Sequence, residues 1–502
     1  MQTPLFEIKG FGGGMTLSDT IGREDQFKIG KNLDYEAKPG KLTNGLGWAA
    51  NYESSNTALT ANIVSILHAS NGEVYLGGSD TRIYQLNNTT PYADIDVVHD
   101  VTAAGAIESL AEYGEYVYWG QASRLGRTNL TGGIGWNDNW QTSLDGKYIP
   151  LKSSTDNKLY IGNGHNIASW DGTTYDSAAL DLSLTYEAQR LEDFGYRYLA
   201  IGANAVYTGF VNASKCKIFL WDRSDPDWND EISIPEKSIQ AMKFVGGYLW
   251  IWAGASCNIY VIPEDSRKAT KMFEFTLEDK ATELVVHPNS VTERDGRIYF
   301  GLSDTEVQSS FAEKLHPRNP TGIYSFPSDP NNFKLNLEYN YTGNIEKYYA
   351  LEKVTLGSGI NFLMTGLEYA LNASATVYSL KRQLVQSSEY LYKDEGTYES
   401  FVYKPSADKQ MFTESFGVEF EPFPANCSLS MYYKKEGDTT WNKVFENFET
   451  ANATEKIVLK KVKAKQLQIK LKIKADTPSF KYTRPYVEKI WVAGHLIPRL
   501  PQ

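Results

Sequence analysis

The strongest constraint on the fold is a strand-like motif that returns about every 45 residues. Each copy is a short apolar run containing an aromatic residue, with glycine and a polar turn close by. One four-stranded blade of a β-propeller occupies about 40 to 50 residues. A small sheet of this kind cannot bury both of its faces alone, whereas in a closed circle each sheet covers the next. The residues that mark the six clear copies are Tyr75, Tyr118, Tyr160, Tyr198, Trp250 and Tyr299.

A weaker seventh copy spans residues 351–380, with Phe362 and Tyr378 in its apolar runs. The sequence therefore predicts an all-β chain whose larger part, residues 51–385, is a propeller of six or seven blades, with seven favoured. Unrelated β-meanders in a sandwich or a β-solenoid are the alternatives. Turn residues at the Gly and Asn/Asp joints between the runs agree with tight antiparallel sheets.

The two ends of the chain have other patterns. Residues 1–50 begin with a Gly-rich stretch, and we expect this extension to close the ring or to reach a neighbouring subunit. Residues 386–410 lose the repeat and are interpreted as bridging strands. Residues 411–502 show short alternating strands, which predict a small C-terminal β-sandwich. The alternation places Leu467, Ile469, Leu471 and Ile473 on one buried face.

Charge limits the classes of partner. The formal net charge is −11, and sequence-specific nucleic-acid binding is not expected, because such binding needs a surplus of Lys and Arg facing phosphates. The lysines between residues 456 and 474 form a local exception. They are either the exposed faces of alternating strands or a contact surface for an acidic partner. No run of 18 apolar residues predicts a membrane span, and no secretory signal is recognised.

The residue types that carry chemistry are scattered. The six histidines do not have metal-ligand spacing, and Cys216, Cys257 and Cys427 lie far apart, which favours buried free thiols. No nucleophile elbow or phosphate-binding loop is present. We therefore expect no catalytic residue, no metal site and no cofactor, and a chain that is not an enzyme. A propeller glycoside hydrolase stays an alternative, with Asp171, Asp222 and Asp295 as acids that are better explained as turn residues.

Three tryptophans stand in loops rich in Asn, Asp and Gly. Trp136, Trp140 and Trp228 could pack between loops or at a protein interface, where aromatic anchors are common, or could stack on sugars. For all three tryptophans, packing at an interface is favoured over stacking on sugars.

The opening segment resembles the start of structural proteins from tailed-bacteriophage tail modules. In that group a Gly-Gly opening precedes a segment of the type Asn-Leu … Pro-Gly-Lys-Leu and then a β-propeller. The matching residues here are Phe11-Gly12-Gly13-Gly14-Met15, Gln26, Lys31-Asn32-Leu33-Asp34-Tyr35 and Pro39-Gly40-Lys41-Leu42-Thr43. The later run Gly322 to Phe326, the Glu399-Ser400 strand and the stretch from Phe420 to Trp441 are similar to that group as well.

The resemblance implies a virion tail component of the nozzle, tail-tip or adaptor type. Such a protein would assemble as a ring with copies of itself and other tail proteins, in the host cytoplasm, and would reside in the virion. The alternative from a different class is a propeller that binds carbohydrate or a host receptor, with a host surface glycan as its partner.

Overall fold

The computed structural model describes most of the chain. The described residues are 4–9, 11, 29–34, 41–44, 48–53, 59–86, 95–101, 105–130, 135–145, 148–206, 216–275, 284–304, 321–340, 346–355, 359, 361–372, 375–383, 395–424, 427–449, 453–475 and 485–498.

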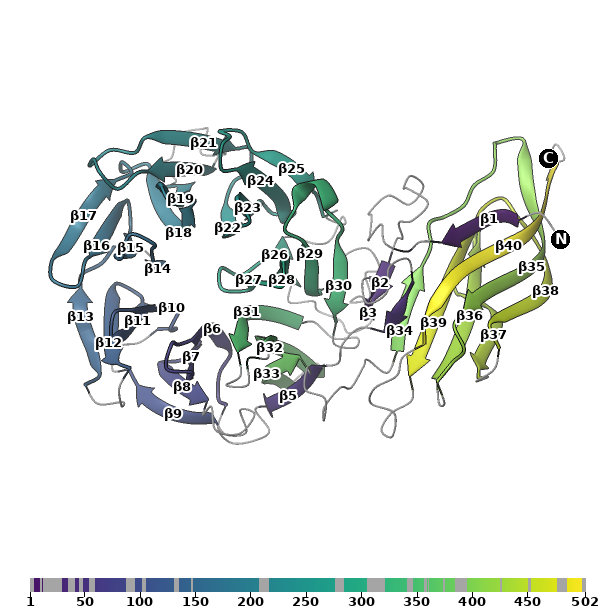
Figure 1. The fold of residues 1–502 in the computed structure, drawn as a ribbon, viewed down its shortest axis with the longest axis horizontal. Helices are drawn as coiled ribbons and strands as arrows, with labels where there is room; N and C mark the ends of the chain where they lie inside the picture. Colours follow the sequence, from purple (N-terminus) through teal and green to yellow (C-terminus); the bar gives the residue numbers. More distant parts are fainter. Residues whose placement is uncertain are drawn as a thin grey trace.

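Seven small antiparallel sheets stand in a circle (Figure 1). Each has four strands in meander order from the axis outward, and each inner strand contacts the inner strand of the next blade until β31 contacts β6. The blades are β6–β9 (Ile63–His68, Val74–Gly78, Arg82–Leu86, Ile95–Asp100), β10–β13 (Ser109–Tyr113, Tyr116–Gln121, Arg124–Asn129, Asn137–Thr142), β14–β17 (Leu151–Ser153, Leu159–Asn163, Asn166–Trp170, Tyr175–Asp181), β18–β21 (Tyr186–Phe194, Tyr198–Ala205, Cys216–Trp221, Asp230–Ile234), β22–β25 (Ile239–Val245, Tyr248–Ala253, Asn258–Pro263, Thr270–Phe273), β27–β30 (Val291–Arg294, Arg297–Asp304, Gly322–Pro327, Asn336–Tyr339) and β31–β33 (Glu346–Thr355, Asn361–Asn372, Ala375–Gln383) with β5 (Trp48–Glu53).

The predicted propeller is confirmed, and its blade count is seven. Every aromatic marker of the repeat lies on the second strand of its blade, from Tyr75 on β7 to Tyr299 on β28. The weak seventh copy forms the last blade. Its outer strand is β5, which comes from the N-terminal side of the chain and pairs with β33 through Gln383 opposite Trp48. This pairing ties the first blade to the last across about 330 residues of sequence, so the circle is closed by backbone hydrogen bonds as well as by packing.

The repeated glycine has a packing role. Gly120 on β11 lies against the segment that enters the next blade, and a Cβ there would come within 2.7 Å of the Ile149 carbonyl oxygen. Ser109 on the neighbouring strand donates a hydrogen bond to the same oxygen at 2.5 Å. Gly77 has the same relation to Ile107, with Ser65 donating to that carbonyl at 2.7 Å. The glycine lets one blade approach the backbone of the next closely.

The C-terminal part forms a β-sandwich, as predicted, but two of its strands come from outside residues 411–502: β1 (Pro4–Lys9) from the N-terminal extension and β34 (Glu395–Glu399) from the expected bridging segment, residues 386–410. One sheet has the order β1-β40-β35-β38, and the facing strands have the order β34-β39-β36-β37. Leu467, Ile469, Leu471 and Ile473 are all fully buried between the sheets, as the alternation predicts. The strands are β1 (Pro4–Lys9), β34 (Glu395–Glu399), β35 (Lys409–Phe420), β36 (Cys427–Lys435), β37 (Asn442–Phe448), β38 (Glu455–Ala464), β39 (Leu467–Ala475) and β40 (Val487–Pro498).

A continuous seam joins the two parts. The strand β2 (Ile29–Lys31) pairs in parallel with β30 of the sixth blade, through Lys31 opposite Leu337, and antiparallel with β34 of the sandwich. The sixth blade and the sandwich thus share one ten-stranded sheet. A small pair formed by β3 (Leu33–Asp34) and β4 (Thr43–Asn44) lies beside it. One apolar cluster runs from Trp250 in the fifth blade through Leu33 and Tyr398 to the sandwich core.

Two short elements complete the described structure. They are the two-residue strand β26 (Leu284–Val285) and the 3₁₀ turn η1 (Pro330–Asn332). No helix within the described ranges is long and apolar enough to cross a membrane. All three cysteines are buried free thiols, as the sequence predicts.

Candidate functional site

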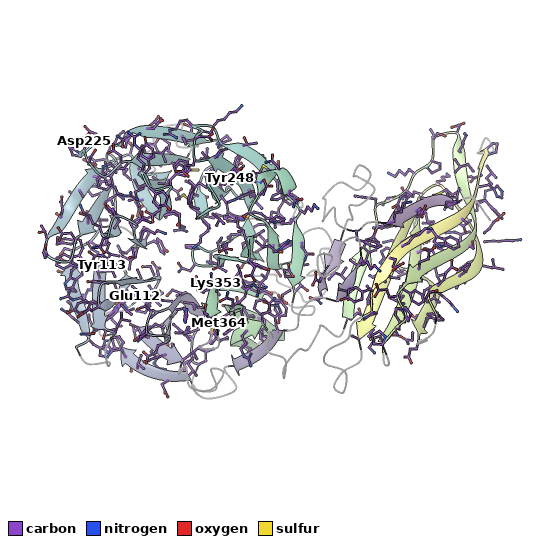
Figure 2. The ribbon with its side chains drawn as sticks, viewed as in Figure 1. Glu112, Tyr113, Asp225, Tyr248, Lys353 and Met364 are labelled. Atoms are coloured by element: carbon purple, nitrogen blue, oxygen red, sulfur yellow. The ribbon has the colours of Figure 1, made fainter. Side chains whose placement is uncertain are left out.

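The axis of the ring holds a cavity of about 520 Å³, lined by inner strands of all seven blades. Its walls carry both signs of charge. Glu112 on β10 and Lys353 on β31 face the central opening (Figure 2). A concave site that gathers polar groups from several elements is the natural place to look for binding.

Asn289 spans the mouth at which the inner strands begin. Its side-chain amide donates to the carbonyl oxygens of Val64 at 2.8 Å and Glu108 at 2.5 Å, in the first and second blades. The Tyr148 hydroxyl, just before β14, donates to its Oδ1 at 3.5 Å. The Leu351 amide of the seventh blade donates to its backbone carbonyl at 2.7 Å. One asparagine from the sixth blade therefore ties four other blades together at the axis.

A half-buried cation, Arg190, lies beside Asn289. The Arg190 guanidinium donates to the Gln240 carbonyl at 2.6 Å and lies over the Tyr148 ring, 4.7 Å from its centroid. Desolvation lowers the pKa of Arg190 to about 10, although Tyr148 and the Glu108 carboxyl oppose this. Burial also raises the pKa of Glu108, and the nearby Arg190 compensates only in part. The cation is held by carbonyl dipoles and an aromatic face rather than by a close ion pair.

The other half of the cavity holds three carboxylates, each bound by its own donor. The Lys152 ammonium lies 2.6 Å from the Glu192 carboxylate. Glu112 accepts from the Ser70 amide at 2.7 Å. Glu352 accepts from the Thr292 hydroxyl at 3.2 Å, and burial raises its pKa. The lining therefore balances its charges mostly within itself, which suits the binding of water or a small polar solute.

His287, two residues before Asn289, makes the stability of the folded chain depend on pH. Its ring lies 4.5 Å from that of Tyr349, and desolvation lowers the pKa of His287 to about 4 from an ordinary value of 6.5. The unfolded chain takes up the proton near pH 6.5 and the folded chain only near pH 4, so stability is lost as the pH falls through this window. The expected loss at pH 5 is about 2 kcal/mol relative to pH 8.

Urea unfolding at pH 8 and pH 5 tests this expectation. The variant His287→Gln should lose about 2 kcal/mol less than the natural chain between the two pH values. Both proteins share every other titrating group, so the difference between them isolates His287. An equal loss in the two proteins would contradict the assignment.

The turn aspartates weighed as hydrolase acids all lie away from the cavity. Asp171 accepts from the Thr173 and Thr174 amides, and these bonds lower its pKa to about 2. Asp222 accepts from the Ser224 amide at 3.1 Å. Asp295 has a positive φ of 54° in the turn between β27 and β28. Their side chains and backbone serve turns, which agrees with the favoured interpretation of the sequence.

The three tryptophans are half-buried and engaged in aromatic packing. Trp136 stacks on His99 of the first blade, with ring centroids 4.4 Å apart. Trp140 meets Trp170 of the third blade edge-on at 5.1 Å. Trp228 packs edge-on against Phe219 at 5.0 Å within its own blade. The structure does not bring them together, because Trp136 and Trp140 belong to the second blade and Trp228 to the fourth. Their proposed contact with a protein surface or a glycan stays a prediction.

The axial residues Asn289, Arg190, Tyr148 and Glu108 were not singled out by the sequence. They are about 40 to 100 residues apart along the chain and meet only because the ring brings the inner strands together. The one local signal is the run His287-Pro288-Asn289-Ser290, which precedes β27 and helps to lengthen the repeat to 49 residues between Trp250 and Tyr299. Among the described residues no group of three or more His, Cys, Asp or Glu could hold a metal ion.

Comparisons with known proteins do not identify a family for this chain. No protein-family model matches the sequence, and no curated protein matches it. The solved structures that resemble the chain include the WD40 repeats of RRP9 (9% identity, 68% of this chain and 99% of that one, TM-score 0.44), the WD40 β-propeller domain of Doa1 (10%, 66% and 97%, 0.44) and virginiamycin B lyase from Staphylococcus aureus (14%, 68% and 100%, 0.44). At such low identity none of them indicates a function. The class of protein is a seven-bladed β-propeller fused to a β-sandwich, and it is defined by the strand order of this chain.

Proposed function

We propose that this chain is a structural component of a bacteriophage virion tail, assembled as a ring through protein–protein contacts. The observation that supports the proposal most is the seam. The segment with the phage-tail resemblance, residues 31–34 and 41–43, lies between propeller and sandwich. There, β2 continues the sheet of the sixth blade into the sandwich.

Further contacts make the seam stiff. Leu42 forms an antiparallel bridge with Val487, with backbone bonds of 3.0 and 2.9 Å. The Lys41 ammonium pairs with the carboxylates of Glu421 and Glu488. Asn336 of β30 donates to the Leu33 carbonyl at 3.2 Å. Two domains that share a sheet and a core behave as one block, and such a block suits a particle whose subunits must hold a fixed angle.

Charge supports a role in assembly as well. Residues 51–390 contain 26 Lys and Arg against 41 Asp and Glu, a formal charge of −15, whereas residues 391–502 contain 18 against 14, a charge of +4. Opposite charges at the two parts favour contact between the propeller of one copy and the sandwich of another.

The test is the particle itself. An antibody against the purified chain should label the tails of virions encoded by the same genome. Electron microscopy of those tails should show symmetric rings into which copies of this chain fit. The full-length protein should also form rings when purified at high concentration. A chain that is absent from virions would rule out the proposal.

A further inference from the structure

The sandwich presents one edge strand that lacks a partner. β38 (Glu455–Ala464) is the last strand in the order β1-β40-β35-β38, and within the described ranges no strand pairs with its outer edge. Free edges of this length offer backbone N–H and C=O groups to another strand, so soluble proteins usually cover or blunt them.

The side chains of this edge suit a contact. Leu459 is 80% exposed and Ile457 is 48% exposed. Ile457 lies opposite Gly417, and the Trp491 ring lies over that glycine in the same row. We call these three large apolar side chains, Ile457, Leu459 and Trp491, the β38 shelf. Apolar side chains that stand out at a strand edge indicate an interaction site.

Lysines determine which strand the edge accepts. Residues 456–474 hold eight lysines and no acidic residue. Lys461 and Lys463 on β38 are exposed, and neither has an acidic partner among the described residues. Two β38 edges would repel one another, which prevents pairing of like with like, whereas an acidic strand would be attracted.

The acidic outer strands of the propeller differ in how far their charges are already neutralised. On β9, Asp100 pairs with Arg82 at 3.0 Å, while Asp96 is exposed and has no ion pair among the described residues. On β21, Asp230 and Glu231 pair with Arg267 and Lys217, at 2.7 and 2.6 Å. On β17, Asp176 and Asp181 accept only from the backbone amides of Ala178 and Ser183 in the contacts resolved among the described residues.

The edge and side chains of β17 also suit pairing with the β38 edge. Strand β17 (Tyr175–Asp181) has no strand paired with its outer edge in the described part of the chain, contains no Lys or Arg, and exposes the small side chains of Ser177 and Ala178. Small side chains leave room for Leu459 of a partner. Figure 1 shows β17 and β38 at opposite ends of the molecule. A contact between opposite ends is heterologous, and such contacts close into rings when the rotation allows it.

We propose that the β38 edge binds the outer strand β17 of a second copy of this chain, with the lysine-rich β38 strand facing the acidic β17 strand. This inference rests on the ring assembly proposed above and names the two surfaces that form the contact. Backbone pairing supplies the geometry, the β38 shelf supplies apolar burial, and the charges select the partner edge.

A charge-reversal cycle on the full-length protein tests the pair of surfaces by sedimentation velocity. The variant Lys461→Glu/Lys463→Glu and the variant Asp176→Lys/Asp181→Lys should each weaken self-association about tenfold or more. The chain with all four reversals should recover most of the natural affinity. The matched control Lys404→Glu/Lys409→Glu reverses two exposed lysines elsewhere on the sandwich and should leave association unchanged.

Cross-linking gives an independent readout. Leu459→Cys and Ala178→Cys, carried on separate copies and mixed, should form an intermolecular disulfide, since the three native cysteines are buried. Both outcomes are decisive. Rings that form normally with no rescue and no cross-link overturn this contact while leaving the tail proposal intact. A chain missing from virions that still shows the rescue overturns the tail proposal alone.

Discussion

The variant Gly366→Ala is expected to lower the free energy of unfolding of the propeller by about 3 kcal/mol. Gly366 lies on β32 of the last blade, against the first strand of the first blade. A Cβ there would overlap the Ile63 carbonyl oxygen and lie 2.8 Å from the Ile63 Cβ. Both neighbouring atoms belong to or adjoin the backbone, so neither can rotate away, and the added methyl group must push β6 from the ring closure. Thermal and urea unfolding of the purified variant measure the loss.

Gly359→Ala provides the matched control in the same blade. Gly359 has a φ of +80° and nothing within 4 Å of a Cβ, so alanine there adds backbone strain of about 1 kcal/mol without a clash. A Gly366→Ala variant no less stable than this control would show that blade contact does not depend on the glycine.

The ring was predictable because its information is local and repeated. Six of the seven second strands carry an aromatic residue and a glycine within a few positions, as in Tyr118 and Gly120, and β23 is the exception. The aromatic residue fills the space between blades, and the glycine admits the next backbone. The alternation from Leu467 to Ile473 predicted a two-sided sheet for the same reason, since period-two patterns encode which face is buried.

The seam was not predictable, because its pairings are distant in sequence and short. Lys31 meets Leu337 across about 300 residues through a single parallel pair, and no periodicity reports such a contact. Three strands of the first 53 residues, apart from the β3–β4 pair, go to three different places: β1 lies beside β40, β2 lies between β30 and β34, and β5 lies beside β33. Composition indicated an extension but not its three destinations.

The residues of the candidate site were even harder to predict from the sequence. Asn289 and Arg190 have ordinary neighbours along the chain, and their importance comes from the axis on which seven inner strands converge. A polar side chain at that point can bond to several blades at once, which a sequence pattern of one blade cannot indicate. Burial then shifts the pKa values of Arg190 and His287, and this also follows from the closed ring rather than from adjacent residues.

Replacement of Tyr398 by alanine is expected to cost about 4 kcal/mol and to uncouple the sandwich from the propeller. Tyr398 on β34 is fully buried at the seam, opposite Gly30 of β2 and Leu471 of β39, and its ring meets Phe11 edge-on at 5.4 Å. Its removal leaves a cavity where the shared sheet crosses from one part to the other. We expect two separate calorimetric transitions in place of coupled unfolding, and a larger radius of gyration by small-angle X-ray scattering. Tyr398→Phe, which keeps the ring, should cost less than about 1.5 kcal/mol and preserve the coupling. If Tyr398→Ala keeps the natural scattering profile and a single transition, then the rigidity of the block does not come from this seam.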